Sequence, residues 1–179
     1  VATLIVDSKA FLTIYMGADF AEKSATLLVL HAISFGSAAI LTVSWQMTEG
    51  LGFPNYNFRV FLLCLVLCVS LMILLIGDYG NFGVAIARLV GFCTIFFSIF
   101  YVEKWFFGAI QTKFWAKNIG SLGVAVGFAA AAQYFIINYL SINWFSFIFA
   151  VFCGGIVYLS LLWILDFVTA DEKILVKGI

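Results

Sequence analysis

The chain has 179 residues, of which 65% are hydrophobic and only 10% are charged. Soluble domains are about a quarter charged, so this composition excludes an ordinary soluble protein and places the chain in the membrane class. Nine Lys and Arg residues balance nine Asp and Glu residues. This balance leaves no basic surface for nucleic acid, and we expect no nucleic-acid partner.

Polar joints divide the chain into apolar segments, which can be tested against the roughly 20 residues that a hydrocarbon core about 30 Å thick requires. Five segments pass the test: residues 24–48, 58–76, 82–102, 119–137 and 144–167. Residues 1–16 predict the end of a further helix, so we expect the C-terminal part of a longer protein. The predicted fold class is all-α, a polytopic membrane helical bundle with about five full transmembrane helices plus the end of a sixth.

The distribution of Lys and Arg over the joints predicts the orientation in the membrane. Successive joints alternate sides, and one side carries only Lys23. The other side carries Arg59, Lys104, Lys113, Lys117, Lys173 and Lys177. The positive-inside rule places this second side in the cytoplasm, together with a C-terminal tail at residues 168–179.

The longest joint, residues 103–118, is too polar to span a membrane. Its central sequence, KWFFGAIQTKFWAK, mixes large aromatic residues with three lysines. Aromatic rings favour the headgroup level and lysines favour anionic lipid, so we expect a cytoplasmic interfacial connection in contact with membrane lipids. A simple loop and an interfacial connecting helix between two sub-bundles both stay open.

Four ionisable residues lie near the predicted midplane, roughly 10–15 Å below the outer face. They are Asp7, Lys9, His31 and Arg88. A charged side chain there costs at least about 2.5–3.5 kcal/mol on insertion scales, so each is a candidate substrate-binding residue. Arg88 is the strongest candidate, because its planar fork suits phosphate or carboxylate and it stays charged. In the structural alternative, Asp7 neutralises Lys9 or Arg88 between helices and His31 is a neutral, hydrogen-bonded residue.

Gln133 completes the set of substrate-binding candidates. It lies about two turns below the outer end of its predicted helix. Its amide could hydrogen-bond a sugar hydroxyl, although a hydrogen bond to another helix is the commoner fate of such a residue.

The sequence contains no catalytic constellation. A single histidine excludes a multi-His metal site, and neither G-x-S-x-G nor G-x-x-x-x-G-K-[ST] occurs. The cysteines lie in apolar runs without ligand spacing and are interpreted as packing residues. They are Cys64, Cys68, Cys93 and Cys153. We expect no enzymatic activity, no cofactor and no metal.

Several stretches carry more information than composition does. Residues 16–35 read MGADFAEKSATLLVLHAISF, and the next helix ends QMTEGLGFPNYNFR at residues 46–59. Residues 74–88 read LLIGDYGNFGVAIAR, and the chain ends FVTADEKILVKGI. In order and spacing these stretches resemble lipid-linked oligosaccharide flippases, the Wzx-like polysaccharide transporters of the multidrug/oligosaccharidyl-lipid/polysaccharide exporter superfamily. The matching Gly17, Phe20, Gly50, Gly52, Pro54, Gly80 and Gly83 are interpreted as turn and packing positions.

The resemblance implies half of an exporter built from two six-helix lobes around a central cavity. Residues 1–102 would be part of the second lobe and residues 119–167 two peripheral helices, and the N-terminal lobe of the same chain would complete the cavity. The implied substrate is a polyprenyl-pyrophosphate-linked oligosaccharide. It would cross the cytoplasmic (inner) membrane by alternating access, for O-antigen or capsule assembly.

Other functions stay open. A drug or cation exporter of the same superfamily should favour carboxylates in its cavity, whereas the midplane residues here are mostly basic. A membrane-embedded glycopolymer polymerase or acyltransferase subunit needs a large outer loop or an intramembrane His/Asp site, and the longest joint here is cytoplasmic. A structural subunit would pair all of its polar membrane residues between helices.

Overall fold

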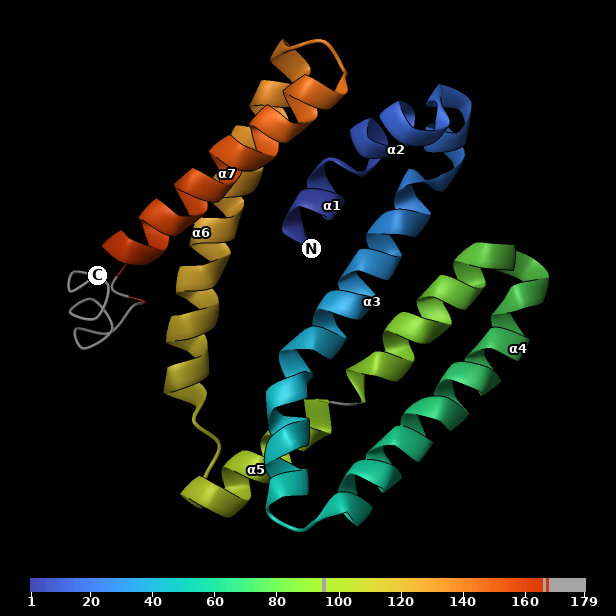
Figure 1. The fold of residues 1–179 in the computed structure, drawn as a ribbon. Helices are drawn as coiled ribbons and strands as arrows, with labels where there is room; N and C mark the ends of the chain where they lie inside the picture. The colour runs from blue at the N-terminus through green and yellow to red at the C-terminus, as the bar shows by residue number, and fades with distance from the viewer. Residues whose placement is uncertain (95, 166, 168–179) are drawn as a thin grey trace. The chain divides into compact units, whose positions relative to one another are not determined.

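The computed structural model describes residues 1–94, 96–165 and 167, and every regular element among them is an α-helix. The predicted all-α class is confirmed for this part of the chain, whereas the predicted tail at 168–179 lies outside it. The helices are α1 (Ala2–Val6), α2 (Ser8–Met16), α3 (Ala18–Gly50), α4 (Pro54–Cys93), α5 (Phe96–Phe107), α6 (Thr112–Tyr139) and α7 (Trp144–Ile164) (Figure 1).

Four helical stretches of the described residues are long and apolar enough to cross a membrane: Ala18–Gly50, Pro54–Trp105, Thr112–Tyr139 and Trp144–Ile164. Many of their large apolar side chains lie on the outside, and Ile73 and Leu74 are 71% and 70% exposed. Exposed apolar surface on this scale suits lipid rather than water. The described chain therefore has the character of a multi-pass, membrane-embedded protein.

The longest stretch, Pro54–Trp105, contains two of the predicted segments, 58–76 and 82–102. Gly80 in α4 has φ 53° and ψ −131°, and the chain reverses direction at this end of α4 (Figure 1). These angles are near the first central position of a type II′ turn, which glycine occupies because it has no Cβ. The two arms of α4, residues 54–79 and 81–93, lie against each other. Cys68 Sγ is 4.0 Å from the carbonyl oxygen of Arg88.

Within the predicted transmembrane segment 82–102, the second arm of α4 ends at Cys93 and α5 begins at Phe96. The backbone N–H and the hydroxyl of Thr94 both donate to the carbonyl of Gly91, at 3.1 and 2.7 Å. This local bonding ends α4 at Cys93, and α5 starts at Phe96. The predicted segment is therefore two successive helices.

The described chain divides into two compact units. Unit 1 consists of Val1 and residues 24–111, and holds most of α3, all of α4 and α5. Unit 2 consists of residues 2–23 and the chain from residue 112 onward, and holds α1, α2, α6 and α7.

Unit 2 is built on the antiparallel pair α6 and α7 (Figure 1). Small and polar residues at four-residue spacing are buried on both helices, and we call these residues the α6–α7 seam. They are Ala125, Ala129 and Gln133 of α6 and Ser146, Ala150 and Gly154 of α7. Small side chains let the two helix backbones approach closely, as is common between membrane helices. Asn143 caps α7, because its side-chain oxygen accepts a hydrogen bond from the Ser146 N–H at 2.8 Å.

Residues 103–118 do not form a separate connecting helix. The last turn of α5 reaches Phe107, and α6 begins at Thr112. Gly108 between them has φ 70°, a left-handed conformation that interrupts helical bonding. Lys113 and Lys117 therefore lie in the first turns of α6.

The turn at Gly80 generates a stability prediction. Gly80→Ala should destabilise the protein by about 1–3 kcal/mol, because a Cβ is strained at this positive φ. The measurement is the unfolding free energy from an SDS titration in mixed micelles, followed by circular dichroism.

Gly77→Ala is the matched control. Gly77 lies just before the turn, its φ is not in the left-handed region, and a Cβ there would meet nothing within 4 Å. Equal stability of the two variants would contradict the assignment of the reversal to Gly80.

Candidate functional site

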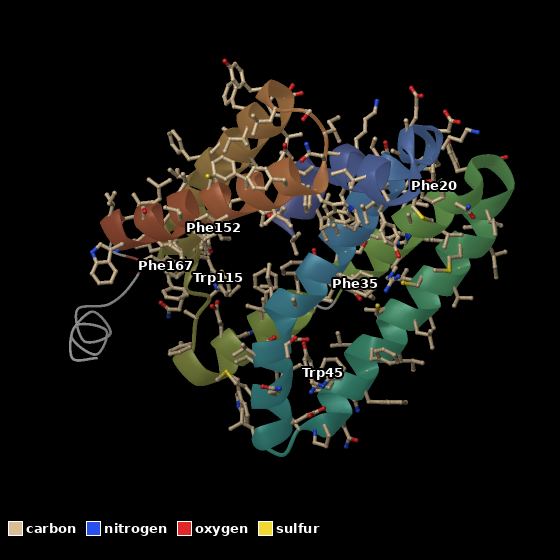
Figure 2. The ribbon with its side chains drawn as sticks, turned by 45° about the horizontal axis from the view of Figure 1, so that its top comes forward. Phe20, Phe35, Trp45, Trp115, Phe152 and Phe167 are labelled. Atoms are coloured by element: carbon tan, nitrogen blue, oxygen red, sulfur yellow. The ribbon has the colours of Figure 1, made fainter. Side chains whose placement is uncertain are left out.

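Arg88, the strongest candidate from the sequence, lies half-buried on the second arm of α4. Its guanidinium carbon is 4.1 Å from the ring centroid of Phe35 on α3 and 5.3 Å from that of Phe92, one turn further along α4. Phe35 is labelled in Figure 2. Within unit 1, no carboxylate of the described residues lies within ion-pair distance of the guanidinium, and no acceptor there takes one of its hydrogen bonds. Among the described residues of unit 1, the contacts of this charge are therefore with two aromatic rings.

His31 lies on the same face of α3 as Phe35, four residues earlier. At this spacing two helical side chains are neighbours, with about 5–6 Å between their Cβ atoms. His31 Nδ1 is buried and has no hydrogen-bond partner in the described structure. The hydrogen-bonded structural role considered for His31 is thus not seen at this nitrogen.

We call Arg88, Phe35, Phe92 and His31 the Arg88 site. A guanidinium offers five N–H donors in a planar fork, which matches two oxygens of a phosphate or carboxylate. An imidazole nitrogen can donate or accept one further hydrogen bond. The chemistry available at this site is the recognition of an anion.

Asp7 and Lys9 belong to unit 2 and do not pair with each other. Asp7 lies at the bend between α1 and α2, where it is only 3% exposed, and its Oδ2 has no hydrogen-bond partner. Lys9 is exposed. Residues two apart do not face each other along a helix, so the Asp7–Lys9 pair of the structural alternative is not formed.

Gln133 takes part in helix packing in unit 2. It is 4% exposed, and its Nε2 donates to Thr3 Oγ1 of α1 at 3.3 Å. Its side chain lies against Gly154 of α7, where an added Cβ would collide with it. Of the two roles considered for Gln133, the described contacts are those of a helix-to-helix hydrogen bond.

The contact of Gln133 with Gly154 generates a second prediction. Gly154→Ala should destabilise the protein by about 1–3 kcal/mol, because the methyl group overpacks the α6–α7 seam and displaces Gln133. The midpoint of thermal unfolding in detergent, followed by tryptophan fluorescence, measures the loss. Gly155→Ala, next in the chain and with nothing within 4 Å of an added Cβ, should unfold at the wild-type temperature or slightly above.

A buried polar cluster joins α3 to α4, and the sequence did not predict it. Asn57 and Thr48 are each 1% exposed, and the Thr48 hydroxyl lies 2.6 Å from Asn57 Oδ1. Asn57 Nδ2 donates to the carbonyl of Trp45 at 3.0 Å, and Trp45 Nε1 donates to Glu49 Oε1 at 2.7 Å. Trp45, labelled in Figure 2, lies near the end of α3. The sequence signal for this cluster was the position of two residues. Asn57 lies in the first turn of α4, and Thr48 lies in the last turn of α3.

Aromatic rings stack beside this cluster. The Tyr56 and Tyr101 rings lie 4.0 Å apart, and those of Phe53 and Trp105 lie 4.3 Å apart in an edge-on arrangement. The Tyr56 hydroxyl donates to the carbonyl of Phe97 at 3.0 Å. These contacts hold α5 against the start of α4, so this end of unit 1 is a packed structural joint.

The buried cluster generates a third prediction. Asn57→Ala should lower the unfolding free energy by about 1–3 kcal/mol, because it removes the hydrogen bonds that Asn57 makes across the two helices, with the Thr48 hydroxyl and with the Trp45 carbonyl. Asn55→Ala, an exposed asparagine in the same helical turn, should change it by less than about 0.5 kcal/mol. An SDS titration of both variants in mixed micelles compares them, and equal losses would show that the cluster contributes no stability.

Three further features of the described residues are apolar or lack the ligands for a metal site. A shallow groove of about 390 Å³ between the end of α6 and the start of α7 is lined by apolar residues: Phe135, Ile136, Tyr139, Leu140 and Phe149. Cys64 and Cys68 are buried and unbonded, and Cys68 packs against Gly91. Within the described residues, no group of three or more His, Cys, Asp or Glu side chains could hold a metal ion.

No protein-family model, no curated protein and no solved structure matches the chain.

Proposed function

We propose that the chain belongs to a transporter that moves a polyprenyl-pyrophosphate-linked oligosaccharide across the cytoplasmic membrane by alternating access, for the assembly of a surface polysaccharide. The observation that carries the proposal is Arg88. It is a permanent positive charge on an apolar helix, and within its unit it has no carboxylate partner among the described residues.

The energies support a functional role for this charge. An arginine at the centre of a membrane helix costs about 2.5–3.5 kcal/mol on insertion scales. Its contacts with Phe35 and Phe92 return about 0.5–2 kcal/mol. The remainder must come from water or from a bound anion. A residue that is costly to the fold and unpaired within it is more readily explained by a ligand than by structure.

A pyrophosphate headgroup has the matching requirement. It cannot cross hydrocarbon without its hydration, and a guanidinium fork replaces part of that hydration with two charge-assisted hydrogen bonds. His31, one turn from Phe35 and with a free Nδ1, supplies a second polar group for the adjoining phosphate.

The architecture we propose follows from the turn at Gly80. The first arm of α4 is counted as one transmembrane pass, and the second arm together with α5 as another. The four apolar stretches then become five transmembrane passes. The five passes, the distribution of Lys and Arg and the family motifs support an inner-membrane protein with a cytoplasmic C-terminus. In this proposal the chain contributes to one of two lobes around the cavity, and the first lobe of the same protein completes it.

A drug or cation exporter of the same superfamily is the second candidate, and Asp7 is the observation that favours it. A carboxylate that is 3% exposed with an unpartnered oxygen suits a cationic substrate. Arg88 favours the first candidate, because a fixed positive charge opposes cation binding.

Deletion of the gene in its host tests the proposal. A flippase requires that surface polysaccharide disappears and that lipid-linked repeat units accumulate on the cytoplasmic leaflet. Unchanged glycan without precursor would overturn the proposal and promote the drug-exporter function. Lost glycan with precursor already on the outer leaflet would instead indicate a polymerase or acyltransferase subunit.

A fourth prediction concerns Arg88 in the same strain. Arg88→Ala should abolish complementation while membrane insertion, measured by immunoblot of the membrane fraction, stays normal. Arg88→Lys should be impaired less but not restored, because an ammonium is a point charge that cannot make the two parallel bonds of the fork.

Arg59→Ala is the control for loss of positive charge. Arg59 is exposed in the second turn of α4, where a long side chain reaches the interface at little cost. The Arg59→Ala strain should export surface polysaccharide normally. If the Arg88→Ala strain also shows wild-type surface polysaccharide, Arg88 does not belong to the substrate-binding site.

A further inference from the structure

We infer that Phe35 is the positioning residue for Arg88, supporting its guanidinium from α3 so that its N–H donors remain available to an anionic ligand. The inference rests on the proposed function for the nature of that ligand, a lipid diphosphate. The observation is the distance of 4.1 Å from the guanidinium carbon to the ring centroid, over the face of the ring.

Phe35 differs from Phe92 in the element that carries it. Phe92 lies four residues after Arg88 on the same arm of α4, so its contact at 5.3 Å cannot tie Arg88 to another helix. Phe35 belongs to α3. Its ring therefore fixes the guanidinium relative to α3, the helix that also carries His31.

The kind of partner also matters. A carboxylate would hold an arginine by taking up its N–H donors and neutralising its charge. An aromatic ring attracts the cation through the negative face of its π system and uses none of these donors in conventional hydrogen bonds. Arg88 is thus oriented while it keeps both its charge and its donors for a ligand.

The test measures ligand binding to the purified full protein in lipid nanodiscs by isothermal titration calorimetry. The probe is farnesyl diphosphate, and farnesol is the same chain without charge. We expect the wild type to bind the diphosphate in preference to farnesol. Phe35→Leu should weaken diphosphate binding by about 2- to 30-fold, the range that a cation–π contact spans.

Three further variants separate positioning from general packing. Phe35→Trp should bind at least as well as the wild type, because tryptophan is the better partner for a cation. Phe35→Leu in the Arg88→Ala background should cause no additional loss. Phe152→Leu, on α7 (labelled in Figure 2) and 66% exposed, should bind like the wild type.

Several outcomes would overturn the inference: equal binding by Phe35→Leu and the wild type, weak binding by a folded Phe35→Trp variant, or an additive loss in the Arg88→Ala background. Absence of any preference for the diphosphate over farnesol would overturn it as well. If the binding pattern is as expected but the deletion strain has normal surface glycan, the proposed flippase function is overturned. The role of Phe35 in positioning Arg88 would still stand.

Discussion

The structure depends on one constraint, which is that backbone N–H and C=O groups inside a hydrocarbon layer must find partners within the protein. Water is absent there, so an apolar chain of this composition can satisfy them only as helices. Each described interruption of a helix is accordingly a place where local bonding takes over. The N–H of Gly17 bonds back to Thr13, Thr94 bonds to Gly91, and Asn143 caps α7.

The same constraint explains how the polar side chains are distributed. Those of Gln133, Thr48 and Asn57 are buried and hydrogen-bonded to a neighbouring helix. Arg88, His31 and Asp7 depart from this pattern, since each has a charged or polar group without a hydrogen-bond partner among the described residues of its own unit. The hydrogen-bonded side chains of Gln133, Thr48 and Asn57 hold helices together. The unpartnered groups of Arg88, His31 and Asp7 remain available to bind a ligand.

Composition and the length of the apolar runs were sufficient to predict the helical class, because burial in lipid selects uniformly apolar runs of a definite length. They were insufficient at the helix ends. The end of α4 at Cys93 follows from one hydroxyl competing for one carbonyl, which no average over a window of residues detects. At the end of α3, which reaches Gly50, Thr48 makes a contact with Asn57 of α4 that no average over a window of residues detects either.

The candidate site could be predicted in part. The cost of a charge in the membrane identified Arg88 and His31 from their positions alone. The contact of Arg88 with Phe35 on α3 lies outside any sequence pattern, because the chain has 21 phenylalanines. Lys9, a candidate by the same argument, is exposed in unit 2, and its role as a substrate-binding residue stays a prediction.

The reversal at Gly80 has a consequence for biogenesis. The turn between the two arms of α4 is too tight to leave a free loop. One arm therefore cannot insert into the bilayer while the other remains in water. Asp78 is exposed beside the turn, so the charge at this end of the hairpin is flanked by the apolar surfaces of both arms. The insertion machinery must therefore accept this part of the nascent chain as a helical hairpin. The apolar surface of the first arm then helps to insert the second arm, which holds Arg88.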